Sequence, residues 1–283
     1  MHRDRTGHGP VDIPFGDSAG RCWDGQMDTA AILALYDDQM RRGAPADSPG
    51  ARVERVGDVV RQLGAEGDWN CVLWSDLGAG SADAAIAAQI RHFASLGREF
   101  EWKLYGHDRP ADLGERLRAA GLVPEPEETL MVAPTQELST AVELPEGLAL
   151  RPVTDPDGVE LMVRVHEEVF GPGRSLRRHL TAQLAEQPET VVMTVAMAGE
   201  LPVSSARLEL YPGTDFAGLW GGGTLPAWRG RGVYRALVAH RARIAAERGY
   251  RYLQVDASDQ SRPILRRLGF TALSTTTPYV FRP

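Results

Sequence analysis

The sequence is poor in cysteine and contains no long apolar run, and both shortages narrow the class of protein. Its two cysteines, Cys22 and Cys71, stand far apart, which argues against a disulfide scaffold and against a cysteine-rich metal site. No apolar stretch approaches the ~20 residues that a membrane-spanning helix requires. The N-terminus also lacks the apolar core of a signal peptide, so we expect a cytoplasmic protein without membrane contact.

Lysine is scarce as well, since Lys103 is the single lysine and, histidines aside, the other basic residues are arginines. The 38 acidic residues outnumber the 31 lysines and arginines, which leaves a net charge of −7. Because neutralising phosphates requires a basic face, we expect no nucleic-acid partner. The seven histidines show no metal-ligand spacing, and no Cys/His or Ser/His pairing is visible, so we expect neither a metal ion nor a covalent intermediate.

Apolar residues, in contrast, are numerous enough to build two cores. The chain has 283 residues, of which 43% are hydrophobic, and this length favours two compact domains. Residues 1–26 are rich in Gly, Asp and Arg without any periodicity and predict a disordered tail. After the tail we expect a first domain over 27–134, a linker over 135–146 and a second domain over 147–283.

The most informative segment is Gly221–Leu237, with the sequence GGGTLPAWRGRGVYRAL. An apolar strand enters a glycine-rich turn, and an Arg/Gly cluster then begins a helix. The first N–H groups of a helix lack partners and carry partial positive charge, so they attract phosphate. Gly230 and Gly232 let an anion approach the backbone closely. Three arginines surround the turn with permanent positive charge: Arg229, Arg231 and Arg235. The segment predicts a diphosphate-binding site.

Two nucleotide-binding motifs fit this segment poorly. The dinucleotide fingerprint GxGxxG needs a third glycine where Arg235 stands, and the P-loop needs a lysine that is missing. The segment instead resembles the cofactor motif Q/R-x-x-G-x-G/A of the GNAT N-acetyltransferase superfamily, with Arg229 in the first position and Gly232 as the central glycine. Tyr234 departs from the motif, because the family has glycine or alanine there. An ordinary glycine-rich turn with solvated arginines is the alternative.

The elements expected around this motif follow the order of a GNAT domain. After a helix from Val233 to near Gly249 we expect a strand, a short helix and a last strand, at Tyr252–Ala257, Ser261–Leu268 and Tyr279–Phe281. Before the motif, alternation and β-branched content predict a strand, a helix and three strands: Leu148–Pro152, Asp157–Phe170, Val191–Ala198, Val203–Leu210 and Phe216–Thr224.

The region before Pro134 also alternates between strands and helices. We expect helices at Ala30–Met40, Ala82–Leu96 and Ala111–Ala120, and strands at Val53–Leu63, Trp69–Leu77, Glu99–Tyr105 and Thr129–Val132. Its stretch FEWKLYGHDRPADLGERLRAAGL parallels RYLQVDASDQSRPILRRLGF near the C-terminus, which suggests an internal duplication. The resemblance thus implies an α/β (α+β) protein of two tandem GNAT-like domains, each a mixed, mostly antiparallel sheet flanked by helices. The first copy has no Arg/Gly cluster and is degenerate; an unrelated α/β domain is the alternative.

The resemblance also implies a reaction, in which an amine directly attacks the thioester of acetyl-CoA within a ternary complex. It assigns the pyrophosphate of acetyl-CoA to a turn of six residues: Arg229, Gly230, Arg231, Gly232, Val233 and Tyr234. It assigns the pantetheine amides to the backbone of Gly222, Gly223 and Thr224. A backbone N–H of the same strand would stabilise the oxyanion. The acceptor is expected to be a small-molecule or peptide amine, whose identity the sequence does not give.

Proton transfer is less clear from the sequence. The tyrosine that commonly protonates the leaving thiolate in this family is replaced by Leu265. Glu209 and Asp256, each near the end of an expected strand, are the candidate bases, although deprotonation through water would need neither. A catalytically silent acyl-CoA-binding sensor or scaffold is therefore the main alternative. Aminoacyl transfer from aminoacyl-tRNA is a third interpretation, which the acidic composition disfavours.

Overall fold

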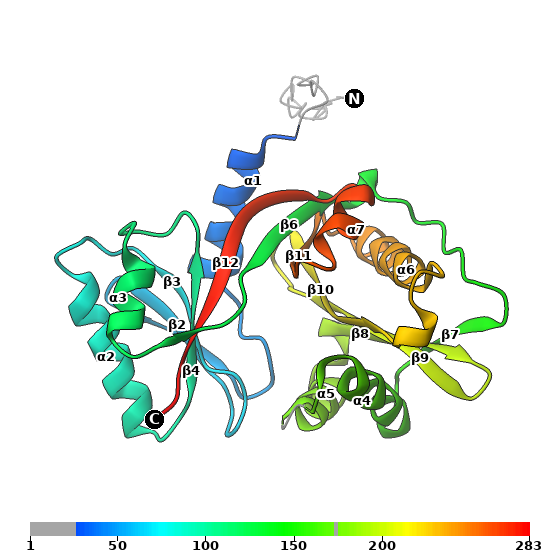
Figure 1. Cartoon of the computed structure of the whole chain (residues 1–283), viewed down its shortest axis with the longest axis horizontal. Helices are drawn as coiled ribbons and strands as arrows, with labels where there is room; N and C mark the ends of the chain where they lie inside the picture. Colours follow the sequence, from blue (N-terminus) through cyan, green and yellow to red (C-terminus); the bar gives the residue numbers. More distant parts are fainter. Residues whose placement is uncertain (1–26, 173–174) are drawn as a thin grey trace, which may run out of the picture.

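A single twelve-stranded sheet runs through the part of the chain that the computed structural model describes, residues 27–172 and 175–283 (Figure 1). Its strands lie in the order β1-β2-β3-β4-β12-β6-β11-β10-β9-β8-β7, and β5 pairs with β12 beside this path. Two pairs are parallel, β3 with β4 and β10 with β11, and the others are antiparallel. The mixed, mostly antiparallel sheet predicted from the sequence is confirmed. The predicted tail, 1–26, lies outside the described residues.

The N-terminal half, from α1 to β6, contains four helical segments and six strands among the described residues. They are α1 (Thr29–Tyr36), the π-helical turn η1 (Asp37–Arg42), β1 (Arg52–Val56), β2 (Val59–Leu63), β3 (Cys71–Ser75), α2 (Ala82–Ser95), β4 (Phe100–Tyr105), α3 (Leu113–Ala119), β5 (Val123–Pro124) and β6 (Glu128–Pro134). The segment 53–63, expected as a strand, is a hairpin, because Gly57 with φ of 61° turns the chain between β1 and β2. Helices α2 and α3 cover one face of this half and bury Ile86, Phe93 and Leu117.

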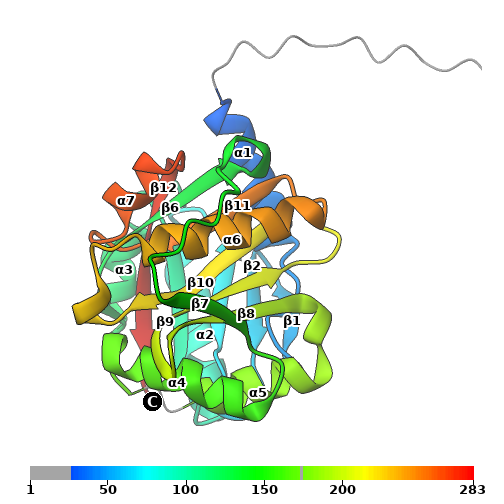
Figure 2. The same cartoon turned by 90° about the vertical axis from the view of Figure 1, so that its right-hand side faces the viewer.

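The C-terminal half, from β7 to β12, follows the predicted order with one additional helix. Its main elements are β7 (Leu148–Pro152), α4 (Pro156–Phe170), α5 (Leu176–Glu186), β8 (Val191–Ala198), β9 (Leu201–Leu210), β10 (Phe216–Thr224), α6 (Val233–Glu247), β11 (Tyr252–Ala257), α7 (Arg262–Arg267) and β12 (Thr271–Phe281). Short 3-10 turns are η2 (Thr135–Glu137), η3 (Pro188–Thr190) and η4 (Pro226–Trp228). Helices α4 and α5 lie against one face of the sheet and α6 against the other (Figure 2).

The two halves exchange their last strands. Strand β6, from the N-terminal half, pairs with β11 from Tyr252 opposite Pro134 to Ala257 opposite Thr129. Strand β12, the last of the chain, continues past β6 and pairs with β4 from Thr276 opposite Tyr105 to Phe281 opposite Phe100. The sheet is therefore continuous across the two halves, and a division of the chain near residue 134 does not divide the sheet.

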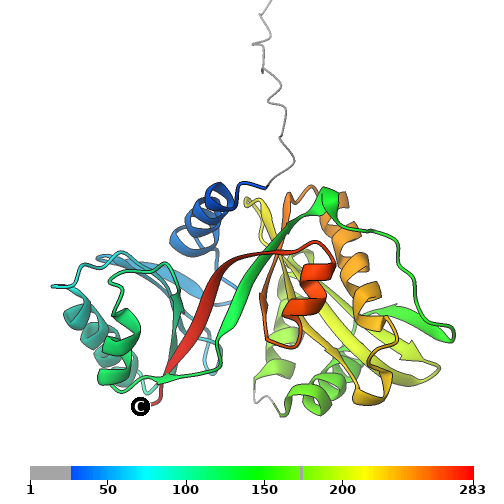
Figure 3. The ribbon, with the colours of Figure 1, turned by 45° about the horizontal axis from the view of Figure 1, so that its top comes forward.

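The two halves share a repeated connection. Helix α2 joins the parallel strands β3 and β4 and is followed by α3, as α6 joins the parallel strands β10 and β11 and is followed by α7. This common order supports the predicted internal duplication, which stays a prediction. The sheet bends where β12 and β6 meet, so that its two halves face each other (Figure 3). Helix α1 packs over the junction, where Tyr36 contacts the rings of Tyr105 and Phe216.

Candidate active site

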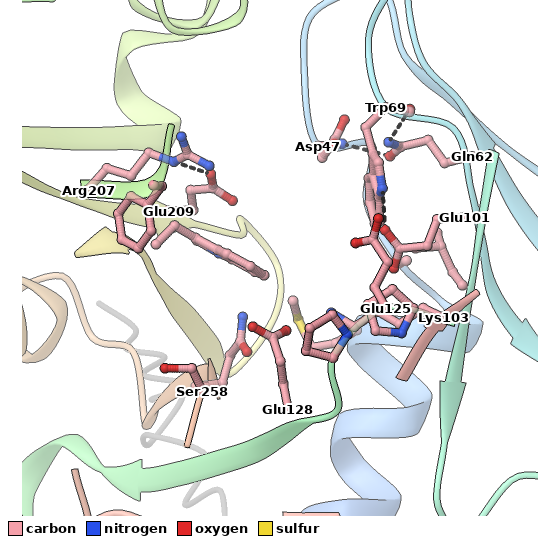
Figure 4. Close-up of a pocket in the computed structure, with 18 of the residues that line it drawn as sticks. Asp47, Gln62, Trp69, Glu101, Lys103, Glu125, Glu128, Arg207, Glu209 and Ser258 are labelled. Atoms are coloured by element: carbon pink, nitrogen blue, oxygen red, sulfur yellow. Dashed lines mark hydrogen bonds and ion pairs between the residues drawn. The ribbon is translucent and has the colours of Figure 1, made fainter. Parts of the chain in front are cut away.

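A cavity of about 920 Å³ lies between the two halves of the sheet (Figure 4). Strand β4 and the loop before β6 contribute one wall and the floor, while β9, β10, β11 and the ends of α4 and α5 contribute the other wall. Alternation along the strands directs polar side chains into it, since successive residues point to opposite faces. On β4 these are Glu101, Lys103 and Tyr105; on β9 they are Arg207 and Glu209, and Tyr211 follows directly after β9.

The wall formed by the C-terminal half contains an open strand edge. The parallel pairing of β10 with β11 covers three residue pairs, from Phe216 opposite Tyr252 to Gly218 opposite Gln254. Past Gly218, β10 pairs with β9 alone among the described residues, and a bulge lies between Trp220 and Gly223. The backbone of Gly222, Gly223 and Thr224 therefore runs along an edge that β11 has left, and an extended ligand can pair with such an edge.

Close contacts behind this edge explain the glycines. A Cβ on Gly222 would lie 3.1 Å from the ring of Tyr234, and a Cβ on Gly223 would lie 2.8 Å from the ring of Phe170. The edge is also anchored from behind, because the Ser204 hydroxyl donates to the Gly223 carbonyl at 2.7 Å and Arg229 Nε donates to the Thr224 carbonyl at 3.0 Å. The segment is held in one conformation, and its glycines add no side chain of their own to the edge.

The Arg/Gly turn leads from this edge into α6. Gly230 and Gly232 have φ of 73° and 88°, and Gly232 is the N-cap residue of the 15-residue helix. No described side chain caps this helix, so its first N–H groups stay available to a ligand. Arg229, Gly230 and Arg231 are exposed, and the Arg231 guanidinium lies 4.8 Å above the ring of Trp228.

The departure from the motif at Tyr234 has a structural explanation. Its ring turns toward the sheet and lies against Gly222, and burial there raises the pKa of the Tyr234 phenol. The side chain of Val233 is buried between α6 and the sheet, so Val233 can offer only its backbone to a ligand. Both side chains therefore pack toward the sheet and not over the turn.

The two predicted carboxylates have different surroundings. Glu209 lines the cavity and accepts hydrogen bonds from Arg207 Nε at 2.8 Å and from the Tyr211 hydroxyl at 2.9 Å. Asp256 does not reach the cavity lining; its side chain is 1% exposed and forms an ion pair with Lys103. The structure thus brings Glu209 to the cavity and holds Asp256 in a contact between β11 and β4.

The N-terminal half contributes polar residues that the sequence analysis missed. Burial raises the pKa of Glu101, whose carboxylate accepts a hydrogen bond from Trp69 Nε1 at 2.8 Å. Burial, reinforced by the charge of Asp256, raises the pKa of Glu128 to about 7. The single lysine of the chain and the alternation of polar residues in FEWKLY are the sequence signals for a polar strand face here, but they do not indicate what that face contacts.

Residues 27–172 and 175–283 contain neither a candidate metal site nor a helix that could cross a membrane. No three His, Cys, Asp or Glu side chains gather in a way that could hold a metal ion. No helix in these ranges is long and apolar enough to cross a membrane. Cys71, the cysteine within them, is buried and free.

Comparison with known proteins identifies the C-terminal half. Residues 159–270 match the model of the acetyltransferase (GNAT) family. Among solved structures, a GCN5-related N-acetyltransferase from Kribbella flavida has a TM-score of 0.66 at 18% identity, covering 90% of this chain and 96% of that one. A tandem GNAT protein from the clavulanic acid biosynthesis pathway has a TM-score of 0.59 at 16% identity, covering 89% and 92%. No curated protein sequence matches the chain significantly.

These structures share the fold over nearly their whole length, while the family match covers β10, the Arg/Gly turn, α6 and β11. The uncapped helix start and the open strand edge described above lie within the matched residues. The C-terminal half therefore contains a region, residues 159–270, that matches the GNAT family, within a fold shared with a tandem GNAT protein.

Proposed function

We propose that the protein transfers an acetyl group from acetyl-CoA to a primary amine by direct attack in a ternary complex. One observation carries the proposal: the open edge of β10 runs from the cavity to the uncapped N-terminus of α6. An acyl-CoA bound along this path would have its charged end at the arginines and its thioester at the cavity. The GNAT family match supports this class of chemistry.

The residues along this path fit the two ends of coenzyme A. The exposed turn offers the free N–H groups of Gly230, Gly232 and the first turn of α6, with Arg229 and Arg231 beside them, and this combination suits a pyrophosphate. The backbone of Gly222, Gly223 and Thr224 suits the amides of the pantetheine arm, because those amides can pair with an unpaired strand edge. A free N–H on the same edge is placed to stabilise the oxyanion of the thioester carbonyl.

The acceptor amine must be neutral when it attacks the thioester, so its ammonium form has to lose a proton in the cavity. The ammonium form of the acceptor loses one proton to a base or to water, and its nitrogen then forms a bond to the acyl carbon. As the C–S bond breaks, the nitrogen loses a second proton and the leaving thiolate takes one up, which gives the amide and free coenzyme A. Glu209 faces the cavity, whereas Asp256 is buried in its ion pair with Lys103. We therefore assign the acceptor side to Glu209, acting directly or through water, and we assign Asp256 a role in holding Lys103 and β4 against β11.

Thiol release tests the proposal directly. The full chain is incubated with acetyl-CoA and a panel of amines, and free coenzyme A is measured with a thiol reagent. Amine-dependent thiol release with intersecting initial-rate lines is the expected result. Parallel lines would contradict the ternary complex. If calorimetry detects acetyl-CoA binding but no amine causes thiol release, the protein is a sensor. Its lack of activity would then be explained by the buried Leu265, which stands where the family commonly has a tyrosine acid.

A further inference from the structure

The cavity lining contains carboxylates that no cationic side chain of the described residues neutralises. We propose that the acceptor carries at least two positive charges, and that Asp47, Glu101 and Glu128 of the N-terminal half bind the charge that does not react; this inference rests on the proposed function. The reacting amine would lie near Gln254 on the opposite wall, where β10 and β11 diverge.

Most cationic side chains in the lining are already neutralised. Arg41 is paired with Asp37 and Asp108, Lys103 with Asp256, and Arg207 with Glu209. Arg229 lies at the end of the β10 edge, where we place the pyrophosphate. The positive charges of the wall are therefore committed to partners within the protein or to the cosubstrate.

Four carboxylates in the lining have no such partner among the described residues: Asp47, Glu101 and Glu128, which are partly buried, and Glu127, which is exposed. Within residues 27–172 and 175–283, no Lys, Arg or His nitrogen lies within 4.0 Å of Asp47, Glu101 or Glu128. Burial is the largest cause of a raised pKa at each of them. Keeping an unpaired carboxylate away from water costs free energy, and a bound cation would recover that cost. In Figure 4, Asp47 and Glu101 lie on the wall opposite Glu209, and Glu128 lies on the floor between the walls.

A separate observation points to a ligand on the C-terminal side. The side chain of Gln254 is 1% exposed and belongs to the cavity lining, yet its Oε1 atom has no hydrogen-bond partner among the described residues. Buried amide oxygens are rarely left without a donor, so a missing N–H group is the expected explanation. Gln254 is the last residue of β11 that pairs with β10, which places this acceptor atom at the start of the open edge.

Together these groups describe an elongated cation. One nitrogen donates to Gln254 beside the path of the thioester, and a second lies against the carboxylates across the cavity. Trp69 holds the Glu101 carboxylate in place through its indole N–H. An acceptor with a carboxylate next to its amine, such as a free amino acid, would be repelled by the same wall. A simple monoamine would leave the carboxylates of this wall without a cationic partner.

The test compares acceptors of matched length and different charge. The set contains diamines of three to six carbons and spermidine, with butylamine as the monocation and 4-aminobutyrate as the zwitterion. Thiol release gives kcat and KM for each amine, and calorimetry gives the affinity for the dications. We expect kcat/KM for the best diamine to exceed that for butylamine by about tenfold or more, mostly through KM, as the loss of one charged contact predicts.

Matched variants assign the effect to the cavity. The double variant Glu101→Gln and Glu128→Gln should lower the preference for the diamine about tenfold, with butylamine little affected. The control, Glu186→Gln and Glu200→Gln, changes the net charge equally at two exposed positions outside the lining and should leave the preference unchanged. Asp47→Asn serves as a second cavity variant if the double variant fails to fold, as judged by circular dichroism.

The outcomes separate this inference from the proposed function. Acetylation of butylamine or 4-aminobutyrate as fast as any diamine would overturn the inference and leave the proposed function standing. Dication binding that is lost in the cavity variants, with no thiol release on any amine, would support the cation site and overturn the proposed reaction. No dication binding and no thiol release would overturn both. If the control variant lost its preference for the diamine to the same extent, the preference would come from non-specific attraction of dications to an acidic protein, and this would also overturn the inference.

Discussion

The two parallel connections of the sheet, β10–α6 and β3–α2, have the same topology and different chemistry. In both, a strand runs into a helix that returns to a parallel neighbour, and in both the pairing ends after a few residues. Helix α6 begins at Gly232 behind two arginines and has no acidic residue in its first turn, whereas α2 begins at Ser81 and carries Asp83 there. A carboxylate at a helix N-terminus occupies the position that a phosphate would take. The fold supplies two similar helix starts, and only α6 combines a first turn without acidic residues with neighbouring arginines, the charge pattern that favours a phosphate.

The largest expected effect concerns the contact that joins the two halves. Asp256→Asn leaves Lys103 charged and largely buried without its partner, and we expect the free energy of unfolding to fall by about 3–5 kcal/mol. Urea denaturation measures the change. Asp83→Asn, which removes an exposed ion pair between Asp83 on α2 and Arg116 on α3, is the control and should change stability little. A similarly small effect of both substitutions would mean that the buried pair does not hold the halves together.

The next effect tests the charge difference between the two helix starts. Arg231→Glu removes a phosphate partner and adds repulsion, so we expect coenzyme A binding to weaken by about 1–3 kcal/mol in calorimetry. Arg91→Glu makes the same charge change at an exposed position of α2 and should leave the affinity unaltered. Unchanged affinity in the Arg231 variant would place the phosphates elsewhere.

A smaller effect separates backbone strain from ligand binding. Gly232→Ala forces a Cβ into a left-handed conformation, which costs about 1 kcal/mol of stability, and it also narrows the approach of an anion to the helix start. Gly97→Ala, after the C-terminus of α2 with φ of 62°, imposes comparable strain. Both variants should lose stability in thermal unfolding, and only the first should lose affinity for coenzyme A. Equal affinities would argue against a close approach of phosphate to Gly232.

The smallest expected effect is a pH-dependent change in stability. The pKa of Glu128 is raised to about 7 from 4.5 by burial and by Asp256, with Glu101 and Glu125 acting in the same direction and Lys103 opposing them. The folded state therefore binds its proton more tightly than the unfolded state, and this residue makes the protein less stable as the pH rises from about 4.5 to 7. Glu128→Gln should raise the Tm at pH 8 and change it little at pH 4. The same Tm difference at both pH values would contradict this assignment, and Glu200→Gln is the exposed control.

The sequence predicted the secondary structure around the local parts of the candidate site, whose ligand-binding roles stay predictions. The glycines of β10, the Arg/Gly turn and the start of α6 are consecutive, so spacing and residue type were sufficient to locate them. Helix α5 was missed because its apolar positions are sparse among polar residues in LRRHLTAQLAE. The cavity wall formed by Glu101 and Lys103 was missed for a different reason. These residues face the C-terminal half only because the sheet bends, and a local pattern does not specify where a sheet bends.

The partners of β6 and β12 were also beyond local reasoning. Alternation predicted a strand near residues 129–132 and another near 279–281, and both exist, the second beginning earlier at Thr271. Which strand each would join depends on edges that are more than a hundred residues away along the chain. Hydrophobic periodicity reports which face of a strand is buried and carries no information about its neighbour.

The exchange of β6 and β12 sets the order in which the molecule can be completed during synthesis. Strand β4 obtains its neighbour on that side from residues 276–281, so its edge stays uncovered until those residues have left the ribosome. The N-terminal half cannot complete its sheet before the C-terminal half is made. A stalled or truncated product therefore exposes the unpaired edge of β4, which is prone to aggregation. Assembly of the first half of the sheet is thus tied to synthesis of residues 276–281.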